Sequence, residues 1–449
     1  MKGLDEAVVA RADREVAAAI DAVLAARPKE AVVGVAPAGA GKSYAIGTAV
    51  ARARQKKLRV AVATPTNEQA YALISSLADR LPRETVTFVH ANHVSLPEAH
   101  DRKNVAAKKA KESNRDGLVV GTLNKLGDAH ARGDLAAFDL LLIDEAYQAN
   151  AVHYYLVGDL APRHLLMGDS GQLAPFSTAP NADHWRGLDE DPLLTAVEVL
   201  LRNHPAKTKQ FKLPITRRLD PRAIPVVRAF YPGHEFHAAV LPGVRELRLS
   251  TASGRGPSAL ADRALDVAAS TGWAHVELPA TAVLSADPAT IVLITQLVRR
   301  LFARAATVRC ERETKRTALA KDQVAVVVSH NDQKLAMRQA LAAAGLGDVE
   351  VNTANKLQGL TFEVVIAWHP LAGLMEADEF HLDPGRLCVM LTRHRQACIV
   401  VGRAGDRALV EGIPPATPSY VGWDSNPALD GWYAHEAVFE ALRTARIEA

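Results

Sequence analysis

Short apolar runs alternate with longer stretches of helical periodicity along most of the chain. Residues 4–26 are rich in Ala and Val, with charges at helical spacing, and predict a helix that leads into a first strand. Continuous apolar runs predict buried strands in both halves, at residues 32–35, 60–64, 117–122, 139–144, 164–168, 324–328, 364–366 and 398–402. Further helices are predicted at residues 68–77, 288–306, 332–344 and 432–445. This alternation predicts the α/β class, with parallel sheets and right-handed crossovers.

The first predicted strand runs into a glycine-rich turn at residues 36–43, A-P-A-G-A-G-K-S. This is the phosphate-binding loop pattern, with Ala36 where glycine is usual. Small residues let backbone N–H groups curl around a triphosphate, and the N-terminus of the following helix adds its positive dipole end. The residues expected to form this cradle are Gly39, Ala40 and Gly41. Lys42 is expected on the β- and γ-phosphates and Ser43 on Mg²⁺, whereas the alternative is a structural turn of small residues.

Polar side chains follow two later strands. Asp144 and Glu145 end the apolar run D-L-L-L-I-D-E, where Asp144 can hold Mg²⁺ and Glu145 can polarise the water that attacks a γ-phosphate. A buried pair of carboxylates without a cation would be costly, so a purely structural role is disfavoured. Gln172, in G-D-S-G-Q-L-A-P, is placed to sense the γ-phosphate or the attacking water, although an ordinary loop amide is the alternative.

Other strands end in hydroxyl and amide groups suited to nucleic-acid phosphates. Thr66 and Asn67 follow one strand in T-P-T-N, and Thr122 and Thr353 end two others. A helix N-cap explains Thr66 or Asn67 equally well. The strongly basic stretch at residues 102–115 is expected either to touch a phosphate backbone or to be a solvated helix face.

Composition narrows the class of protein. The chain has 449 residues, 48% of them hydrophobic and 23% charged, as in an ordinary globular protein of two to four domains. Its net charge of +3 neither demands nor excludes a nucleic-acid groove. Three scattered cysteines predict reduced thiols, and the absence of a long apolar run or a signal-like N-terminus predicts a cytoplasmic protein without a membrane span.

The order of these motifs resembles that of the superfamily 1 helicases. G-A-G-K-S, T-P-T-N, G-T, D-E-A-Y-Q and G-D-S-G-Q-L-A-P match the family's first half, and D-E-A-x-Q points to the branch of the nonsense-decay RNA helicase type and its DNA-acting relatives. In the second half, residues 213–221 resemble motif IV with Arg218 on its arginine, and residues 383–395 resemble motif VI with Arg393 on its arginine. Residues 352–366 resemble motif V, whose Q-G-x-T is similar to that of RecD-like and Dda-like helicases.

The resemblance implies two RecA-like parallel-sheet domains that hydrolyse ATP with Mg²⁺ and move 5′-to-3′ on single-stranded nucleic acid, DNA being favoured over RNA. The catalytic residues it implies are Glu145, Gln172, Arg218 and Arg393. Two departures concern the base of the nucleotide. Residues 4–26 lack the glutamine that often reads adenine, and Arg217 stands where a tyrosine often stacks, although an arginine plane can stack as well.

The expected domains are residues 1–84 with 119–205, a small basic insertion at 85–118, a second domain at 206–410, and a C-terminal loop with a docking helix at 411–449. Two other functions fit parts of this pattern. One is an ATPase that remodels nucleoprotein without separating strands, and the other is a nucleotide-gated binding module. The full hydrolytic set argues against the binding module, which does not need it.

Overall fold

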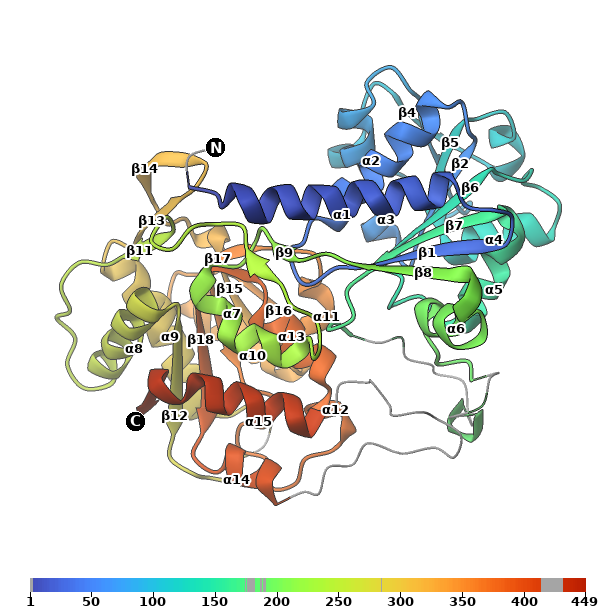
Figure 1. Cartoon of the computed structure of the whole chain (residues 1–449). Coiled ribbons are helices and arrows are strands. Elements are labelled where there is room, and N and C mark those ends of the chain that lie inside the picture. Colours follow the sequence, from blue (N-terminus) through green and yellow to red (C-terminus); the bar gives the residue numbers. More distant parts are fainter. Residues whose placement is uncertain are drawn as a thin grey trace. The chain divides into compact units, whose positions relative to one another are not determined.

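The computed structural model describes residues 3–173, 175, 182–185, 188, 191–283, 285–412 and 431–449. The chain divides into two compact units. The N-terminal unit comprises Ala10–Ser170 and Ala174–Pro214, and the C-terminal unit comprises Met1–Val9, Gly171–Leu173 and Ile215–Ala449. Each unit has its own parallel sheet (Figure 1).

The N-terminal unit is built on an eight-stranded sheet in which every neighbouring pair is parallel. Its strands, in sheet order, are β4 (Val105–Lys108), β3 (Val86–Val89), β5 (Leu118–Thr122), β2 (Val60–Thr64), β6 (Leu140–Asp144), β7 (Arg163–Gly168), β1 (Glu30–Val35) and β8 (Thr208–Lys212). The central strands are buried along their length, as their continuous apolar runs predict. All carboxyl ends therefore meet at one edge of the sheet.

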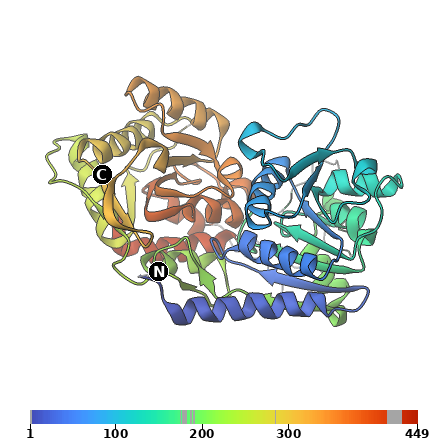
Figure 2. The ribbon, with the colours of Figure 1, turned by 90° about the horizontal axis from the view of Figure 1, so that it is seen from above.

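Helix α1 (Glu6–Leu24) precedes β1. The helices that connect these strands are α2 (Lys42–Gln55), α3 (Asn67–Arg80), α4 (Leu123–Ala131), α5 (Ala151–Val157) and α6 (Ala196–Asn203). The predicted N-terminal helix is confirmed as α1, a single continuous helix (Figure 2). Thr66 begins α3 through a capping box, since its hydroxyl accepts from the Gln69 N–H while the Gln69 side chain accepts from the Thr66 N–H.

Two expected boundaries differ from the structure. Residues 85–118 do not form a separate insertion, because β3 and β4 within them extend the eight-stranded sheet beside β5. The N-terminal unit also continues past residue 205, since β8 pairs with β1 in parallel register and the unit ends at Pro214.

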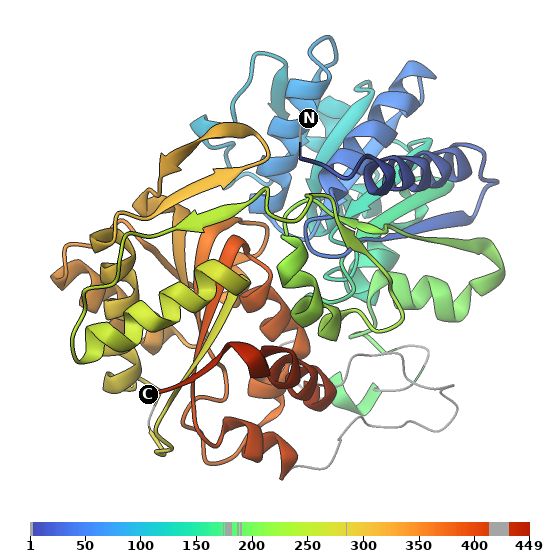
Figure 3. The ribbon, with the colours of Figure 1, turned by 60° about the vertical axis from the view of Figure 1, so that its left-hand side comes forward.

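The C-terminal unit has a six-stranded parallel sheet. Its strands, in sheet order, are β16 (Glu350–Thr353), β15 (Val324–Val328), β17 (Phe362–Trp368), β18 (His394–Arg403), β12 (Trp273–Leu278) and β19 (Arg446–Glu448). The remaining strands form an antiparallel set, β11 (Glu246–Arg248), β13 (Thr307–Cys310) and β14 (Glu313–Ala318), and a short pair, β9 (Ile215–Thr216) and β10 (His237–Ala238). Figure 3 shows the β13–β14 hairpin in gold.

Helices cover both faces of this second sheet. They are α7 (Ile224–Val227), α8 (Pro257–Thr271), α9 (Pro288–Ala303), α10 (Asn331–Ala343), α11 (Ala354–Leu357), α12 (Glu379–Leu382), α13 (Pro384–Leu391), α14 (Asp406–Glu411) and α15 (Gly431–Leu442). Alternate residues of β15 enter two cores, Val326 with α8, α9 and α10, and Val327 with α7, α11, α13 and α15. This double burial explains why β15 reads as a continuous apolar run.

The C-terminal segment differs in part from the expected loop and helix. The segment contains the helix α15, which ends at Leu442, and β19 follows and pairs with β12 in the sheet. Residues 413–430 of the expected loop lie outside the described residues.

Two parallel-sheet units confirm the predicted fold class of two RecA-like domains. Among the described helices, none has the length and apolarity that crossing a bilayer requires.

Candidate active site

The phosphate-binding loop lies at the carboxyl end of β1. Gly39 and Gly41 have φ values of 76° and 95°, in the left-handed region that glycine adopts without strain, and α2 begins at the next residue, Lys42. Ala36 is fully buried and does not have a positive φ, so a Cβ is compatible with the position where the pattern usually has glycine. The loop thus has the backbone shape that the sequence predicts for a phosphate cradle.

Lys42 lies among carboxylates at this edge. Its Nζ is 3.2 Å from Glu145 Oε1 and 3.9 Å from Asp169 Oδ2. Burial alone would lower the pKa of Lys42, but the charges of Glu145, Asp169 and Asp144 outweigh it and raise the pKa. Lys42 therefore stays charged, as a phosphate ligand must.

Asp144 is buried at the end of β6, and its pKa is raised to about 7 by burial and by the adjacent charge of Glu145. Three carboxylates face one ammonium group here, so the cluster carries excess negative charge. A divalent cation would relieve this excess, and carboxylate and hydroxyl oxygens are the donors that Mg²⁺ prefers. Asp144 and Ser43 stay the predicted magnesium ligands, and the described residues include no group of three or more His, Cys, Asp or Glu side chains arranged to hold a metal ion by themselves.

Glu145 has an unusual backbone. Its φ of 54° lies in the left-handed region, which is strained for a residue with a side chain. The turn is held by hydrogen bonds from Ala146 N–H to Met167 O (3.0 Å) and from Gln148 N–H to Glu145 O (2.8 Å). A Cβ on Gly168 would lie 2.6 Å from the Tyr147 ring, so only glycine lets β7 approach this turn. Local packing thus fixes the direction of the Glu145 side chain.

The predicted phosphate-contacting threonines of the N-terminal unit lie at the carboxyl ends of two neighbouring strands. Thr66 lies two residues after β2, and Thr122 is the last residue of β5. Each hydroxyl accepts from a backbone N–H, that of Gln69 (3.3 Å) for Thr66 and that of Lys125 (3.2 Å) for Thr122. The N-cap alternative is therefore confirmed for Thr66. Asn67 is the first residue of α3.

Gln172 and Thr353 belong to the C-terminal unit. The Gln172 side chain is buried, and its Oε1 accepts from Gln358 Nε2 at 2.9 Å. Gly385 of α13 makes this possible, because a Cβ there would lie 2.7 Å from the Leu173 backbone. Thr353 ends β16 and begins α11.

The predicted arginines of the C-terminal unit lie together. Arg218 Nη1 donates to Thr392 O (3.2 Å), next to Arg393. Arg393 is buried, and it donates from Nε to Val389 O (3.1 Å) and from Nη2 to Thr392 Oγ1 (3.3 Å). The structure thus joins the motif IV-like and motif VI-like segments within one unit.

Two family models described as AAA domains match the chain, one over residues 19–178 and the other over residues 285–405. Both models are of the superfamily 1 helicase type, and together they cover more than half of the chain. The chain belongs to the superfamily 1 helicases. No curated protein matches the sequence.

Solved structures resemble this helicase-family chain more distantly. An arterivirus nonstructural protein 10, a helicase in complex with DNA, has 14% identity and a TM-score of 0.43, with 86% of this chain and 62% of that one covered. The S. cerevisiae protein Dbp5, bound to Nup159, Gle1, IP6 and ADP, has 10% identity and a TM-score of 0.45, with 100% of this chain and 96% of that one covered. The chain thus spans less than two thirds of the arterivirus protein.

The sequence did not single out Arg245 and Glu311, a buried pair that lies beside the backbone of Arg217 and Arg218. Arg245 is buried and pairs with Glu311, Nε to Oε2 and Nη2 to Oε1, both at 2.9 Å. It also donates to the backbone oxygens of Arg218 and, at 2.9 Å, Arg217. Burial would raise the pKa of Glu311, but the hydrogen bonds and charge of Arg245 lower it. Asp169 was overlooked too, although its position after a buried strand was a usable signal.

The basic stretch at residues 102–115 is partly neutralised. Three of its cations lie beside carboxylates, in the pairs Arg102–Asp79 (3.3 Å), Lys108–Asp116 (2.8 Å) and Lys111–Asp134 (3.2 Å). Lys109 is exposed. This stretch contains β4 and one short 3₁₀ turn, Ala110–Ser113, so these described residues do not form the helix face that was one of the two alternatives.

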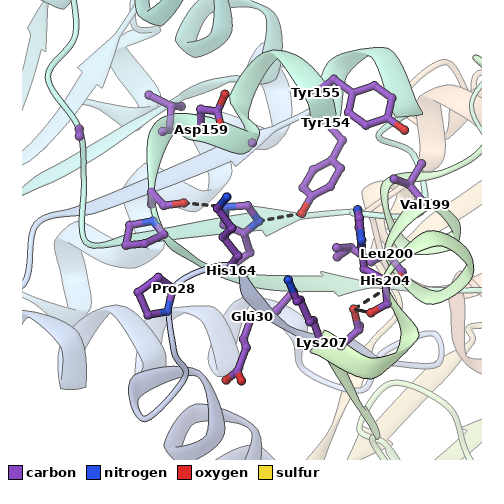
Figure 4. A pocket seen from close by; sticks show the side chains of 18 residues that line it. Pro28, Glu30, Tyr154, Tyr155, Asp159, His164, Val199, Leu200, His204 and Lys207 are labelled. Carbon is purple, nitrogen blue, oxygen red and sulfur yellow. Dashed lines mark hydrogen bonds between the residues drawn. The ribbon is translucent and has the colours of Figure 1, made fainter.

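A cavity of about 590 Å³ lies at the opposite end of the sheet, beside the first residues of β1, β7 and β8 (Figure 4). Two polar side chains that line the cavity, Tyr154 and His164, are hydrogen-bonded within the protein. The Tyr154 hydroxyl and His164 Nδ1 are 2.7 Å apart, and His164 Nε2 is 2.9 Å from Ala161 O. Burial lowers the pKa of His164, which favours the neutral ring. The described residues that line this cavity include none of the predicted site residues.

Proposed function

We propose that this superfamily 1 protein is a nucleic-acid-stimulated ATP hydrolase that moves along single strands, 5′-to-3′. The observation that carries the proposal is the cluster of Lys42, Glu145 and Asp169 beside a phosphate-binding loop at the carboxyl edge of a parallel sheet. Such a cluster suits phosphoryl transfer, in which catalysis is mostly positioning and electrostatic stabilisation.

The residues of the N-terminal unit divide the work. Lys42 and the loop N–H groups bind the triphosphate, so the phosphates compete with Glu145 for the Lys42 ammonium group. Glu145 then orients and polarises the attacking water. Asp144 and Ser43 would hold Mg²⁺, which would neutralise charge on the phosphates when bound.

The C-terminal unit supplies the other catalytic groups. Gln172 senses the γ-phosphate or the water, and Arg218 and Arg393 stabilise negative charge that develops on the phosphate, a contribution typically worth about 10³–10⁵ in turnover. We propose that ATP closes the two units and that hydrolysis opens them. Thr66, Thr122 and Thr353 would then grip the nucleic-acid backbone alternately, without strong sequence preference.

The decisive experiment compares two variants by ATP binding and hydrolysis. Lys42→Ala is expected to lose tight nucleotide binding, whereas Glu145→Gln is expected to keep binding and to lose about 10²–10⁴ in turnover. Rates are measured with and without saturating single-stranded DNA or RNA, and strand separation is measured separately. Wild-type turnover in Glu145→Gln would refute the assignment of the base, and ATPase activity without strand separation would favour remodelling over unwinding.

The nucleotide base is proposed to be read weakly, with Arg217 as the stacking group. Comparing the hydrolysis of ATP, GTP and CTP tests this. A preference for ATP above about a hundredfold, or about 2.7 kcal/mol, would reveal a specific adenine pocket.

A further inference from the structure

A row of side-chain amides leads from the T-P-T-N loop to Glu145. The Thr66 N–H donates to Gln69 Oε1 (3.1 Å), Gln69 Nε2 donates to Gln148 Oε1 (3.0 Å), and Gln148 Nε2 donates to Glu145 Oε2 (3.3 Å). All four residues belong to the N-terminal unit. Gln69 and Gln148 are half-buried, whereas Thr66 is exposed. An exposed loop is thus joined to the candidate base by three successive hydrogen bonds.

The direction of this row is fixed at both ends. A backbone N–H can only donate, and an ionised carboxylate can only accept. Turning the amide of Gln69 or Gln148 around would bring two donors or two acceptors face to face. The three bonds therefore support one another, and the loss of one removes the reason for the orientation of the next.

Gln148 also holds Glu145 from two directions. Its side chain donates to Oε2 of Glu145, while Lys42 lies at Oε1 (3.2 Å), so each carboxylate oxygen has a partner. Its backbone N–H donates to Glu145 O and closes the turn in which Glu145 has its positive φ. A base needs its oxygen aimed at the water, so whatever moves Gln148 changes how well Glu145 works.

We infer that Gln69 and Gln148 are positioning residues that adjust Glu145 when nucleic acid occupies the T-P-T-N loop. The inference rests on the proposed function, because it assumes that this loop binds nucleic acid and that Glu145 is the base. A phosphate oxygen would accept from the Thr66 hydroxyl, whose Oγ1 already accepts from the Gln69 N–H at 3.3 Å, so phosphate binding draws Thr66 and the first turn of α3 toward the phosphate. Gln69 lies in that turn and carries the shift to Gln148. Part of the nucleic-acid stimulation thus arises inside one unit.

The competing explanation is that Gln69 only caps α3. Gln69→Glu separates the two roles, because a glutamate at this position still accepts from the Thr66 N–H, as capping boxes require, but cannot donate to Gln148. Gln148→Leu breaks the last bond of the row instead. The matched control is Gln333→Glu in the C-terminal unit, where the same side-chain oxygen accepts from the backbone N–H groups of Ser329 and His330 at the start of α10.

The measurement is the turnover number, the KM for ATP and the oligonucleotide affinity of each variant, with and without saturating single-stranded oligonucleotide. Gln69→Glu and Gln148→Leu are expected to lose stimulated turnover by on the order of tenfold, with the oligonucleotide affinity and the KM for ATP changed less than twofold. The double variant is expected to have the same stimulated turnover as the less active of the two single variants, because both substitutions interrupt the same row of hydrogen bonds. Gln333→Glu is expected to keep the wild-type ratio of stimulated to unstimulated turnover.

Three results overturn the inference, and they are distinguishable. If the wild-type enzyme is stimulated and Gln69→Glu is stimulated equally, the row does not transmit occupancy of the loop, while the proposed function stands. If the wild-type enzyme hydrolyses ATP without any response to oligonucleotide, the proposed function and the inference fail together. An equal loss of stimulated and unstimulated turnover in Gln69→Glu would assign that residue to the cap alone.

Discussion

The buried pair of Arg245 and Glu311 allows a sharp test of how the arginines of the C-terminal unit are held. Replacing Arg245 by methionine leaves Glu311 buried without its partner, since Arg245 is 1% exposed and the Glu311 side chain is 8% exposed. Breaking a buried ion pair from one side typically costs about 3–5 kcal/mol. Arg245→Met is therefore expected to lower the free energy of unfolding by about that amount, measured by urea denaturation.

A double variant separates stability from positioning. Arg245→Met combined with Glu311→Leu removes both charges, and such replacements of a buried pair by apolar residues are often neutral or stabilising. The double variant is expected to recover most of the lost stability. It still lacks the hydrogen bonds from Arg245 to the backbone oxygens of Arg217 and Arg218, so ATP turnover is expected to stay about tenfold below wild type.

Two outcomes for these variants would refute the reasoning. Wild-type turnover in the double variant would show that Arg245 does not position Arg218. A loss of less than about 1 kcal/mol in Arg245→Met would show that Glu311 is readily solvated or protonated. Arg245→Lys provides a second check, because an ammonium group cannot make the forked bonds of a guanidinium and should restore charge without restoring turnover.

Three further predictions concern packing, pH and the basic stretch. Gly385→Ala is expected to cost about 1–3 kcal/mol of unfolding free energy and to reduce turnover, since its Cβ would press on the Leu173 backbone, whereas Gly158→Ala, which meets nothing within 4 Å, is expected to be neutral or slightly stabilising. Burial lowers the pKa of His435 to about 4, so its contribution to stability is present above the unfolded pKa of 6.5 and is lost as pH falls toward 4. At pH 5 the loss of unfolding free energy relative to neutral pH is about 2 kcal/mol. The His435→Leu variant is therefore expected to show a smaller decrease in the free energy of unfolding, measured with urea, between pH 7.5 and 5. Lys109→Ala is expected to lower the slope of log affinity against log salt by about 0.7 if it contacts a phosphate of a single strand, and an unchanged slope would indicate a merely solvated side chain.

The buried central strands could be predicted from the sequence because burial on both faces leaves its signal in the strand's own residues. β2, β6 and β15 have helices or strands on every side, so each reads as a continuous apolar run. The edge strands β8 and β19 were not predicted, because they lack a continuous apolar run. β8 reads T-K-Q-F-K and β19 has three residues, and both are strands only because a distant partner lies beside them.

Some residues of the candidate site could likewise be predicted from local sequence, and others could not. Lys42, Asp144 and Glu145 follow from motif and position, whereas Arg245 and Glu311 are 66 residues apart and no spacing rule joins them. Gln69 had a readable signal as the fourth residue of a Thr-x-x-Gln capping box. Its second role could not be read, because the Gln148 oxygen that receives its hydrogen bond lies 79 residues further along the chain.

The position of β1 has a consequence for synthesis on the ribosome. Both of its neighbours come late in the chain, since β7 ends at Gly168 and β8 ends at Lys212. At about 5–20 residues per second, the strand that carries the phosphate loop waits on the order of ten seconds or more after synthesis before its second partner exists. During that interval the edge of β1 that pairs with β8 has unpaired backbone N–H and C=O groups beside apolar side chains. The nascent chain is therefore expected to need shelter from a chaperone until β8 emerges, and slow codons just before β8 should increase aggregation.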